Sequence, residues 1–173
     1  MQKDDTLKKT LKNFETTIEQ MGEKRKGIFT DWLQVQTNYL KWETSFNPKY
    51  LRAYRRGEIV LAHFGFNVGT EYGGIHYATI VRNSSKSNPN LNIVPLTSLE
   101  NEVDENTIHR DRVLLGIIDG LNGLKSVAIP DQMRSISKLR VIKPKKQNQT
   151  VFKLSIEQMD MLDDKVRRLY TKI

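Results

Sequence analysis

The sequence predicts an α+β protein: a helical arm over residues 1–50, followed over residues 51–173 by a small curled antiparallel sheet or barrel that ends in a helix. Three observations predict this class. Apolar residues of the arm recur at alternating spacings of four and three, the repeat of one helix face. Short apolar or β-branched runs bounded by turn residues fill the middle of the chain. Helical spacing then returns near the C-terminus.

The apolar stripe of the arm runs from Leu7 to Phe46, with Arg25 in its one polar position. A continuous helix from about Asp4 to Ser45 would be roughly 60 Å long at ~1.5 Å per residue. Gly22 and Gly27 flank a charged run, and a break there would make the arm a helical hairpin. The sequence does not decide between the continuous helix and the hairpin. The stripe is typical both of a helix packed on its own domain and of an intermolecular coiled coil, and both readings stay open.

Two strands joined by a glycine-rich loop open the second region. The apolar runs at 58–64 and 77–81 predict the strands, and the loop at 65–74 carries four glycines around one carboxylate, Glu71. Glycines placed in this way let the backbone turn sharply or approach a ligand closely. His76 follows the loop directly and opens the second strand.

The remaining elements are shorter. In order, they are a strand at 91–96 closed by Thr97 and Ser98, a polar surface loop at 99–106, a strand at 113–118, and a strand at 126–133 that leads into 134–142. Asp119-Gly120 is a hairpin-turn dipeptide, and Pro130 indicates an edge or irregular strand. After a basic linker, Ser155 and Gln158 have the spacing of a capping box that starts the last helix.

Charge and composition limit the function classes. A net charge of +8 and a pI near 9.6 favour an acidic partner such as nucleic acid or an acidic protein tail. The lack of cysteine excludes disulfides, thiolate nucleophiles and Cys-based zinc sites, and the three histidines lack the HExxH spacing. We therefore expect any catalysis to be metal-independent or to use a loosely bound ion. The polar start and the lack of an apolar run near ~20 residues predict a cytoplasmic protein without a membrane span.

Four motifs stand in order through the second region: RGE at 56–58, GxE at 69–71, VPLTS at 94–98 and DQMRS at 131–135. With the closing helix, they make residues 55–173 resemble the MazF/PemK (Kid) toxin family. The resemblance implies an SH3-like barrel that forms a homodimer and cleaves single-stranded RNA without a metal or other cofactor. It also implies an RNA groove at the dimer interface that the acidic tail of a cognate antitoxin blocks. The helical arm lies outside the resemblance.

The resemblance also implies roles for individual residues. Glu71 corresponds to the family's loop glutamate, and Thr97 corresponds to the threonine that contacts the scissile phosphate. Asp131 corresponds to the acidic residue before the family's glutamine, here Gln132, and Arg134 corresponds to the basic residue of the same segment. The chain departs from the family at His76, where an arginine commonly follows the glycine pair, and at Tyr77, where proline is usual.

Cleaving RNA without a metal requires a base for the 2′-hydroxyl proton, positive charge or donors for the phosphorane, and an acid for the departing 5′-oxygen. Histidine titrates near neutrality and serves as base or acid, whereas arginine serves mainly as a positive clamp. We therefore expect His76 and either Asp131 or Glu71 to share the proton transfers, with Thr97 donating to the phosphate. The products would carry 2′,3′-cyclic phosphate and 5′-hydroxyl ends. The expected substrate-binding residues are Arg82, Ser98, Gln132 and Arg134.

Other readings of the same residues stay open. A histidine at a strand start is often an ordinary half-buried side chain, and Thr97 with Ser98 can simply end a strand. At the level of function, one alternative is a non-catalytic RNA- or protein-binding module that has kept its groove. The other is a toxin directed at a topoisomerase, since a related barrel acts in that way and fold alone does not separate the two.

Overall fold

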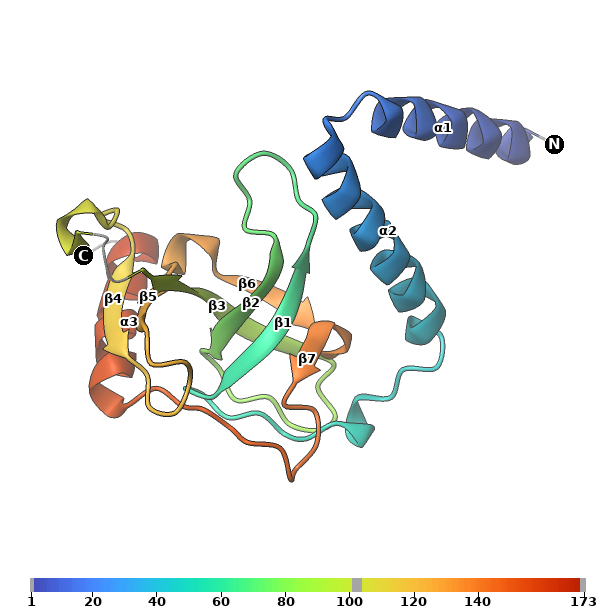
Figure 1. The fold of residues 1–173 in the computed structure, drawn as a ribbon. Helices are drawn as coiled ribbons and strands as arrows, with labels where there is room; N and C mark the ends of the chain where they lie inside the picture. The colour runs from blue at the N-terminus through green and yellow to red at the C-terminus, as the bar shows by residue number, and fades with distance from the viewer. Residues whose placement is uncertain (1, 101–103, 172–173) are drawn as a thin grey trace. The chain divides into compact units, whose positions relative to one another are not determined.

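The computed structural model describes residues 2–100 and 104–171, so residues 101–103 of the expected polar loop lie outside the described residues. The chain divides into two compact units, Met1–Thr44 and Ser45–Ile173 (Figure 1). Within the described ranges, no helix is both long enough and apolar enough to cross a bilayer.

The first unit consists of two helices, α1 (Gln2–Glu19) and α2 (Glu23–Glu43). Gly22 takes an extended conformation and forms the N-cap of α2, so the arm is a broken helix and not a continuous one. The rings of Phe14 and Phe29 meet edge to face with 5.5 Å between their centroids. Among residues 3–44, Phe29 is the one buried residue.

The second unit is a curled antiparallel sheet with a C-terminal helix. Its strands are β1 (Ile59–Gly65), β2 (Gly74–Ile80), β3 (Asn90–Leu99), β4 (Val113–Ile117), β5 (Lys125–Ala128), β6 (Arg134–Ser137) and β7 (Val141–Lys143). Their order is β4-β5-β3-β2-β1-β7, and β6 also pairs with β3. The central strand β3 thus pairs with β2 along one edge and with β5 and β6 in succession along the other.

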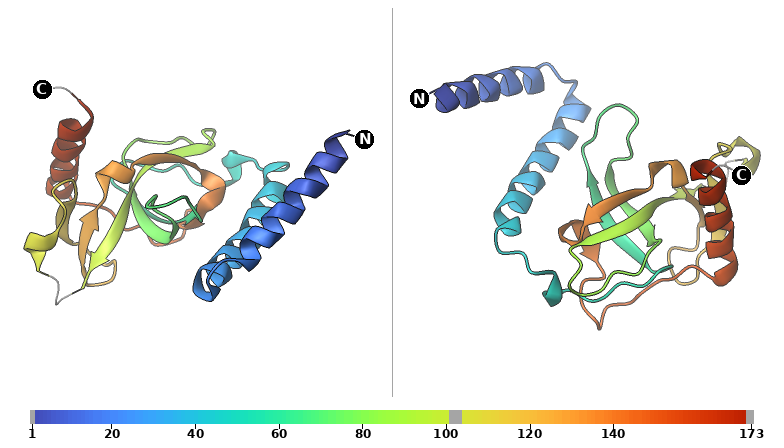
Figure 2. Two further views of the ribbon diagram at one scale, coloured as in Figure 1. Left: turned by 90° about the horizontal axis from the view of Figure 1, so that it is seen from above. Right: turned by 180° about the vertical axis from the view of Figure 1, so that it is seen from behind.

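Two hydrophobic cores hold this unit together, because alternate strand residues face opposite sides of the sheet. Val60 and Phe64 of β1 belong to the core inside the curl, and Ile59 belongs to the second core. Helix α3 (Ile156–Tyr170) covers the second core with Leu162, which is 0% exposed, and lies beside the β4 and β5 end of the sheet (Figure 2).

The observed architecture confirms the predicted fold class, a small barrel-like antiparallel sheet with N-terminal helices and a C-terminal helix. The sheet is not closed, because β4 and β7 stand at the two ends of the pairing order among the described strands. The capping box is confirmed: the Gln158 backbone N–H donates to Ser155 Oγ at 3.2 Å, and the Ser155 N–H donates to Gln158 Oε1 at 2.9 Å.

Two strand predictions need correction. The second strand begins at Gly74, before the predicted start at His76, because Gly74 already pairs with Gly65 across a bulge. The region from 126 to 142 is not one extended run but β5, the short 3₁₀ helix η3 (Pro130–Gln132), β6, the 3₁₀ helix η4 (Lys138–Arg140) and β7. Since proline has no N–H to donate to a strand ladder, Pro130 interrupts the pairing at η3.

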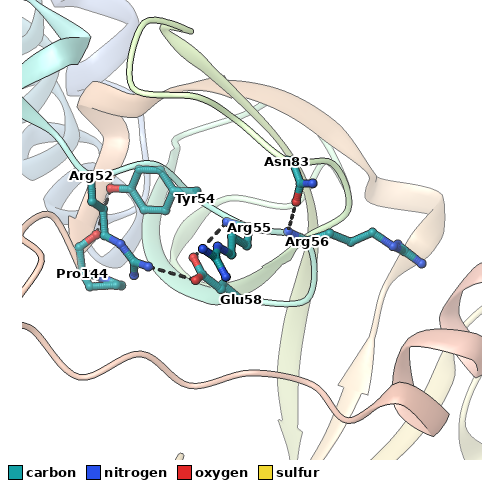
Figure 3. Close-up of polar contacts among 7 residues, drawn as sticks. All are labelled: Arg52, Tyr54, Arg55, Arg56, Glu58, Asn83 and Pro144. Carbon is teal, nitrogen blue, oxygen red and sulfur yellow. Dashed lines mark hydrogen bonds and ion pairs between the residues drawn. The ribbon is translucent and has the colours of Figure 1, made fainter.

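The segment leading into β1 is fixed by a buried polar cluster (Figure 3). Arg52 and Glu58 form an ion pair of 2.9 Å in which each side chain is 9% exposed. The other carboxylate oxygen of Glu58 accepts from the Arg55 N–H at 3.0 Å. The Tyr54 hydroxyl donates to the Pro144 carbonyl at 2.8 Å, and burial raises the pKa of Tyr54 to about 12. Glu58, the last residue of the RGE motif, therefore has a structural role.

Candidate functional site

The loop between β1 and β2 is shaped by close backbone approach. A Cβ added at Gly73 would lie 2.7 Å from the carbonyl oxygen of Gly65, nearer than real Cβ contacts come. Gly74 has φ +82°, which favours glycine. The Asn67 side-chain amide spans the loop and donates to the Tyr72 carbonyl at 2.7 Å. These contacts hold Tyr72 in the loop just before β2.

Tyr72 is the centre of a small hydrogen-bonded group. Its hydroxyl lies 3.1 Å from Nδ1 of His76, and the two ring centroids are 4.4 Å apart. The hydroxyl donates to the Leu96 carbonyl at 3.3 Å and is also hydrogen-bonded to the Thr97 side chain. Because a phenol has one proton, Tyr72 either donates to Leu96 and accepts from Nδ1–H of His76 or donates to Nδ1, according to the tautomer of the ring. In either tautomer, the neutral ring keeps one nitrogen unprotonated.

Burial sets the protonation of this pair. It lowers the pKa of His76 below its ordinary value, and a hydrogen bond with the Gly73 backbone opposes this effect only in part. Burial also raises the pKa of Tyr72, against the Thr97 hydrogen bond and the positive charge of Arg112. At neutral pH, His76 is thus a neutral ring able to accept a proton, and Tyr72 is a neutral phenol.

The second edge of β3 adds an irregular segment to the site. Leu96 pairs with Ala128 and Ile93 pairs with Arg134, so residues 129–133 stand opposite residues 94–95 and bulge out of the ladder. The Tyr170 hydroxyl of α3 donates to the carbonyl of Pro130 at 3.0 Å and holds the bulge in place.

Gln132, at the end of this bulge, joins it to the glycine-rich loop. Its side-chain oxygen accepts from the Tyr72 backbone N–H at 3.1 Å and from Nη2 of Arg134 at 3.0 Å. The Arg134 guanidinium also lies 5.5 Å from the centre of the Phe64 ring. Gln132 therefore positions both the loop and a half-buried guanidinium.

Two exposed carboxylates flank the hydrogen bond between Tyr72 and Gln132. Glu71 precedes Tyr72 on the loop, and Asp131 precedes Gln132 on η3. Among the residues that the structure describes, no three histidine or carboxylate side chains gather as a metal site would require.

Two of the expected binding residues lie elsewhere. Ser98 follows Thr97 on β3 and so faces the other side of the strand, where it accepts from the Asn122 side-chain amide at 3.0 Å. Arg82 is exposed beyond the far end of β2, six residues from His76 or roughly 20 Å at ~3.3 Å per residue. The structure thus gathers His76, Thr97, Gln132 and Arg134, with Glu71 and Asp131 beside them.

No pattern in the sequence predicts the positions of two residues of this site. The hydroxyl of Tyr72 has no motif of its own, although the GxE motif immediately before it marks the loop as functional. Arg112 stands just before β4 in a stretch without a motif, and only folding brings its charge close to Tyr72.

The second unit is thus a small curled sheet domain with a polar site where a loop, a central strand and a bulge meet. Residues 55–170 match the family model described as PemK-like, MazF-like toxin of type II toxin-antitoxin system. The chain belongs to this family, as the motifs predicted. Toxins of this family are generally endoribonucleases.

Two solved structures are similar to the chain. MazF (Form-I) from Deinococcus radiodurans is 18% identical, with 69% of this chain and 98% of that chain covered and a TM-score of 0.49. MazE-MazF (Form-II) from the same organism is 17% identical, with 67% and 94% covered and a TM-score of 0.44. A search of curated proteins finds no match.

Proposed function

We propose that the chain is an endoribonuclease that cleaves single-stranded RNA, in particular mRNA, without a metal ion. The observation that carries this proposal is the neutral His76 ring, held through Nδ1 by Tyr72 beside Thr97, within the domain of a toxin family. The 2′-oxygen attacks the phosphorus, the bond from phosphorus to the 5′-oxygen breaks, and the products carry 2′,3′-cyclic phosphate and 5′-hydroxyl ends.

His76 is the general base of this mechanism. Its lowered pKa keeps the ring neutral at neutral pH, and its unprotonated nitrogen takes the 2′-hydroxyl proton. Tyr72 holds the ring through Nδ1 and accepts a stronger hydrogen bond once the ring becomes cationic.

Three further residues act on the phosphate and the leaving group. The guanidinium of Arg134, which Gln132 fixes, faces the charge that develops on the phosphorane. The Thr97 hydroxyl turns from Tyr72 to donate to a phosphate oxygen. Glu71 or Asp131 shares the proton transfers with His76, and comparison of Glu71→Gln with Asp131→Asn identifies which one does so.

The proposal includes two partners. We infer a homodimer whose groove binds RNA, and a cognate antitoxin whose acidic tail occupies the same groove. Membership of a type II toxin family and a net charge of +8 support both inferences.

The test is incubation of the purified protein with a long single-stranded RNA in EDTA, with analysis of the fragment ends. We expect discrete fragments with 2′,3′-cyclic phosphate and 5′-hydroxyl ends. RNA that is bound but left intact would replace the proposal with a binding module. A parallel topoisomerase assay on supercoiled DNA is expected to show no effect, and inhibition there without RNA cleavage would favour the topoisomerase-directed alternative.

A further inference from the structure

The helical arm carries apolar residues that its own fold leaves uncovered. In α1, Leu7 is 57% exposed, Leu11 is 56% exposed and Phe14 is 42% exposed. All three belong to the regular stripe at helical spacing, so they form one continuous face and not scattered surface positions. A face of this kind is typical of a surface that pairs with another chain.

A groove of about 670 Å³ runs along this face, between α1 and α2. Its apolar residues are Leu11, Phe14, Ile18 and Leu33. Its charged residues separate by sign along α1: Lys8 and Lys12 lie toward the N-terminal end, and Glu15 and Glu19 lie toward the C-terminal end. The groove is therefore basic at one end and acidic at the other.

This arrangement is complementary to itself. In a two-fold symmetric interface, the same patch of each subunit meets its own copy in the opposite direction. If two α1 helices pair antiparallel about a point between Leu11 and Phe14, the Leu11 side chain of each copy faces Phe14 of the other. The basic end of each groove then meets the acidic end of its partner, whereas parallel pairing would place like charges together.

We propose that the arm is a self-association surface, in which α1 pairs antiparallel with α1 of a second copy of this chain. The surface lies outside residues 55–170, which match the toxin family, so it is separate from any pairing of the sheet domains. Its residues are distinct from those of the His76 site.

A charge-swap experiment on the full chain tests this proposal. Because the chain has no cysteine, Asn13→Cys creates a single labelling position near the centre of the expected pair and outside the groove. Donor-labelled and acceptor-labelled chains are mixed, and energy transfer reports the proximity of the arms.

The acidic variant is Lys8→Glu with Lys12→Glu, and the basic variant is Glu15→Lys with Glu19→Lys. The matched control, Lys9→Glu with Lys24→Glu, changes the net charge by the same amount as the acidic variant but at positions outside the groove.

We expect transfer in the unsubstituted chain and in the control, loss of transfer when either variant is mixed only with itself, and recovery when the acidic and basic variants are mixed. Recovery shows that each variant still folds. Unchanged transfer in the self-mixed variants would overturn the proposal, as would a lack of recovery when the acidic and basic variants are mixed. Neither result depends on RNA cleavage, so the arm and the proposed activity are tested separately.

Discussion

The two units of the chain bury their apolar residues to very different extents. In the arm, the most buried side chain is Phe29 at 9% exposure, whereas Val60, Ile80 and Leu162 of the sheet unit are all 0% exposed. The sheet covers both of its faces, one by curling and one with α3, but two helices joined at a turn leave most of one face open. A regular apolar repeat therefore predicts a helix well but does not by itself provide a core.

The largest effect is expected at the buried ion pair of the sheet unit, compared with an exposed ion pair of the same unit. Arg52→Leu leaves the buried Glu58 carboxylate without its charge partner, and we expect it to lower the free energy of unfolding by about 3–5 kcal/mol. Arg168→Leu, at the exposed pair of Arg168 with Asp164, is the control and should cost at most about 1 kcal/mol. Urea denaturation measures both, and equal losses would show that the Arg52 pair is not the constraint we describe.

Truncation of leucine compares the two units directly. Leu162→Ala removes a fully buried side chain and should cost about 2–5 kcal/mol in the unfolding of the sheet unit. Leu11→Ala, on the arm, should change the same transition by no more than about 0.5 kcal/mol. A large effect of Leu11→Ala would mean that the arm contributes to the core of the sheet unit.

Glycine substitution should have opposite signs in the two units. Gly73→Ala places a Cβ against the Gly65 backbone, so we expect a loss of about 1–3 kcal/mol and a displaced Tyr72. Gly27→Ala lies within α2 with no atom in the way of the new Cβ and should stabilise that helix by about 0.5–1 kcal/mol. Thermal unfolding followed by circular dichroism measures both changes. A neutral Gly73→Ala would contradict the close approach at the loop.

The smallest effect is a dependence of stability on pH. Burial lowers the pKa of His76, and burial together with the positive charge of Arg140 lowers the pKa of His63. Below about pH 6.5, the unfolded chain therefore binds more protons than the folded chain, so stability is fully present above that pH and falls as the pH drops toward the lowered pKa values. Urea denaturation between pH 5 and 8 should show this slope, and His76→Gln should reduce it. The arm contains no histidine, and its helicity should not change over this range.

The elements that were predicted correctly depend on local signals. The start of α3 follows from the spacing of Ser155 and Gln158, and β1 follows from one short apolar run. The break between α1 and α2 was one of two open readings, the other being a continuous helix, because glycine weakens a helix without always ending it. Only Gly22 interrupts the helix, and Gly27 lies inside α2.

The site was predictable only in part, because its geometry depends on contacts between distant segments. The pattern placed Thr97 at the end of a strand, whereas pairing with β5 extends β3 to Leu99 and leaves Thr97 inside it. The hydrogen bond from Tyr72 to Gln132 joins residues sixty positions apart, and no spacing in the sequence indicates it. The proximity of Arg112 to Tyr72 arises in the same way.

The most direct measurement of the central claim is the rate of RNA cleavage in EDTA by His76→Ala, compared with His109→Ala. His109 is exposed outside the site, and its substitution provides the matched control. We expect a loss of about 10²–10⁴-fold for His76→Ala, typical of removing a general base, and wild-type cleavage by His109→Ala. Cleavage by His76→Ala at the wild-type rate would contradict the assignment of His76 as the base.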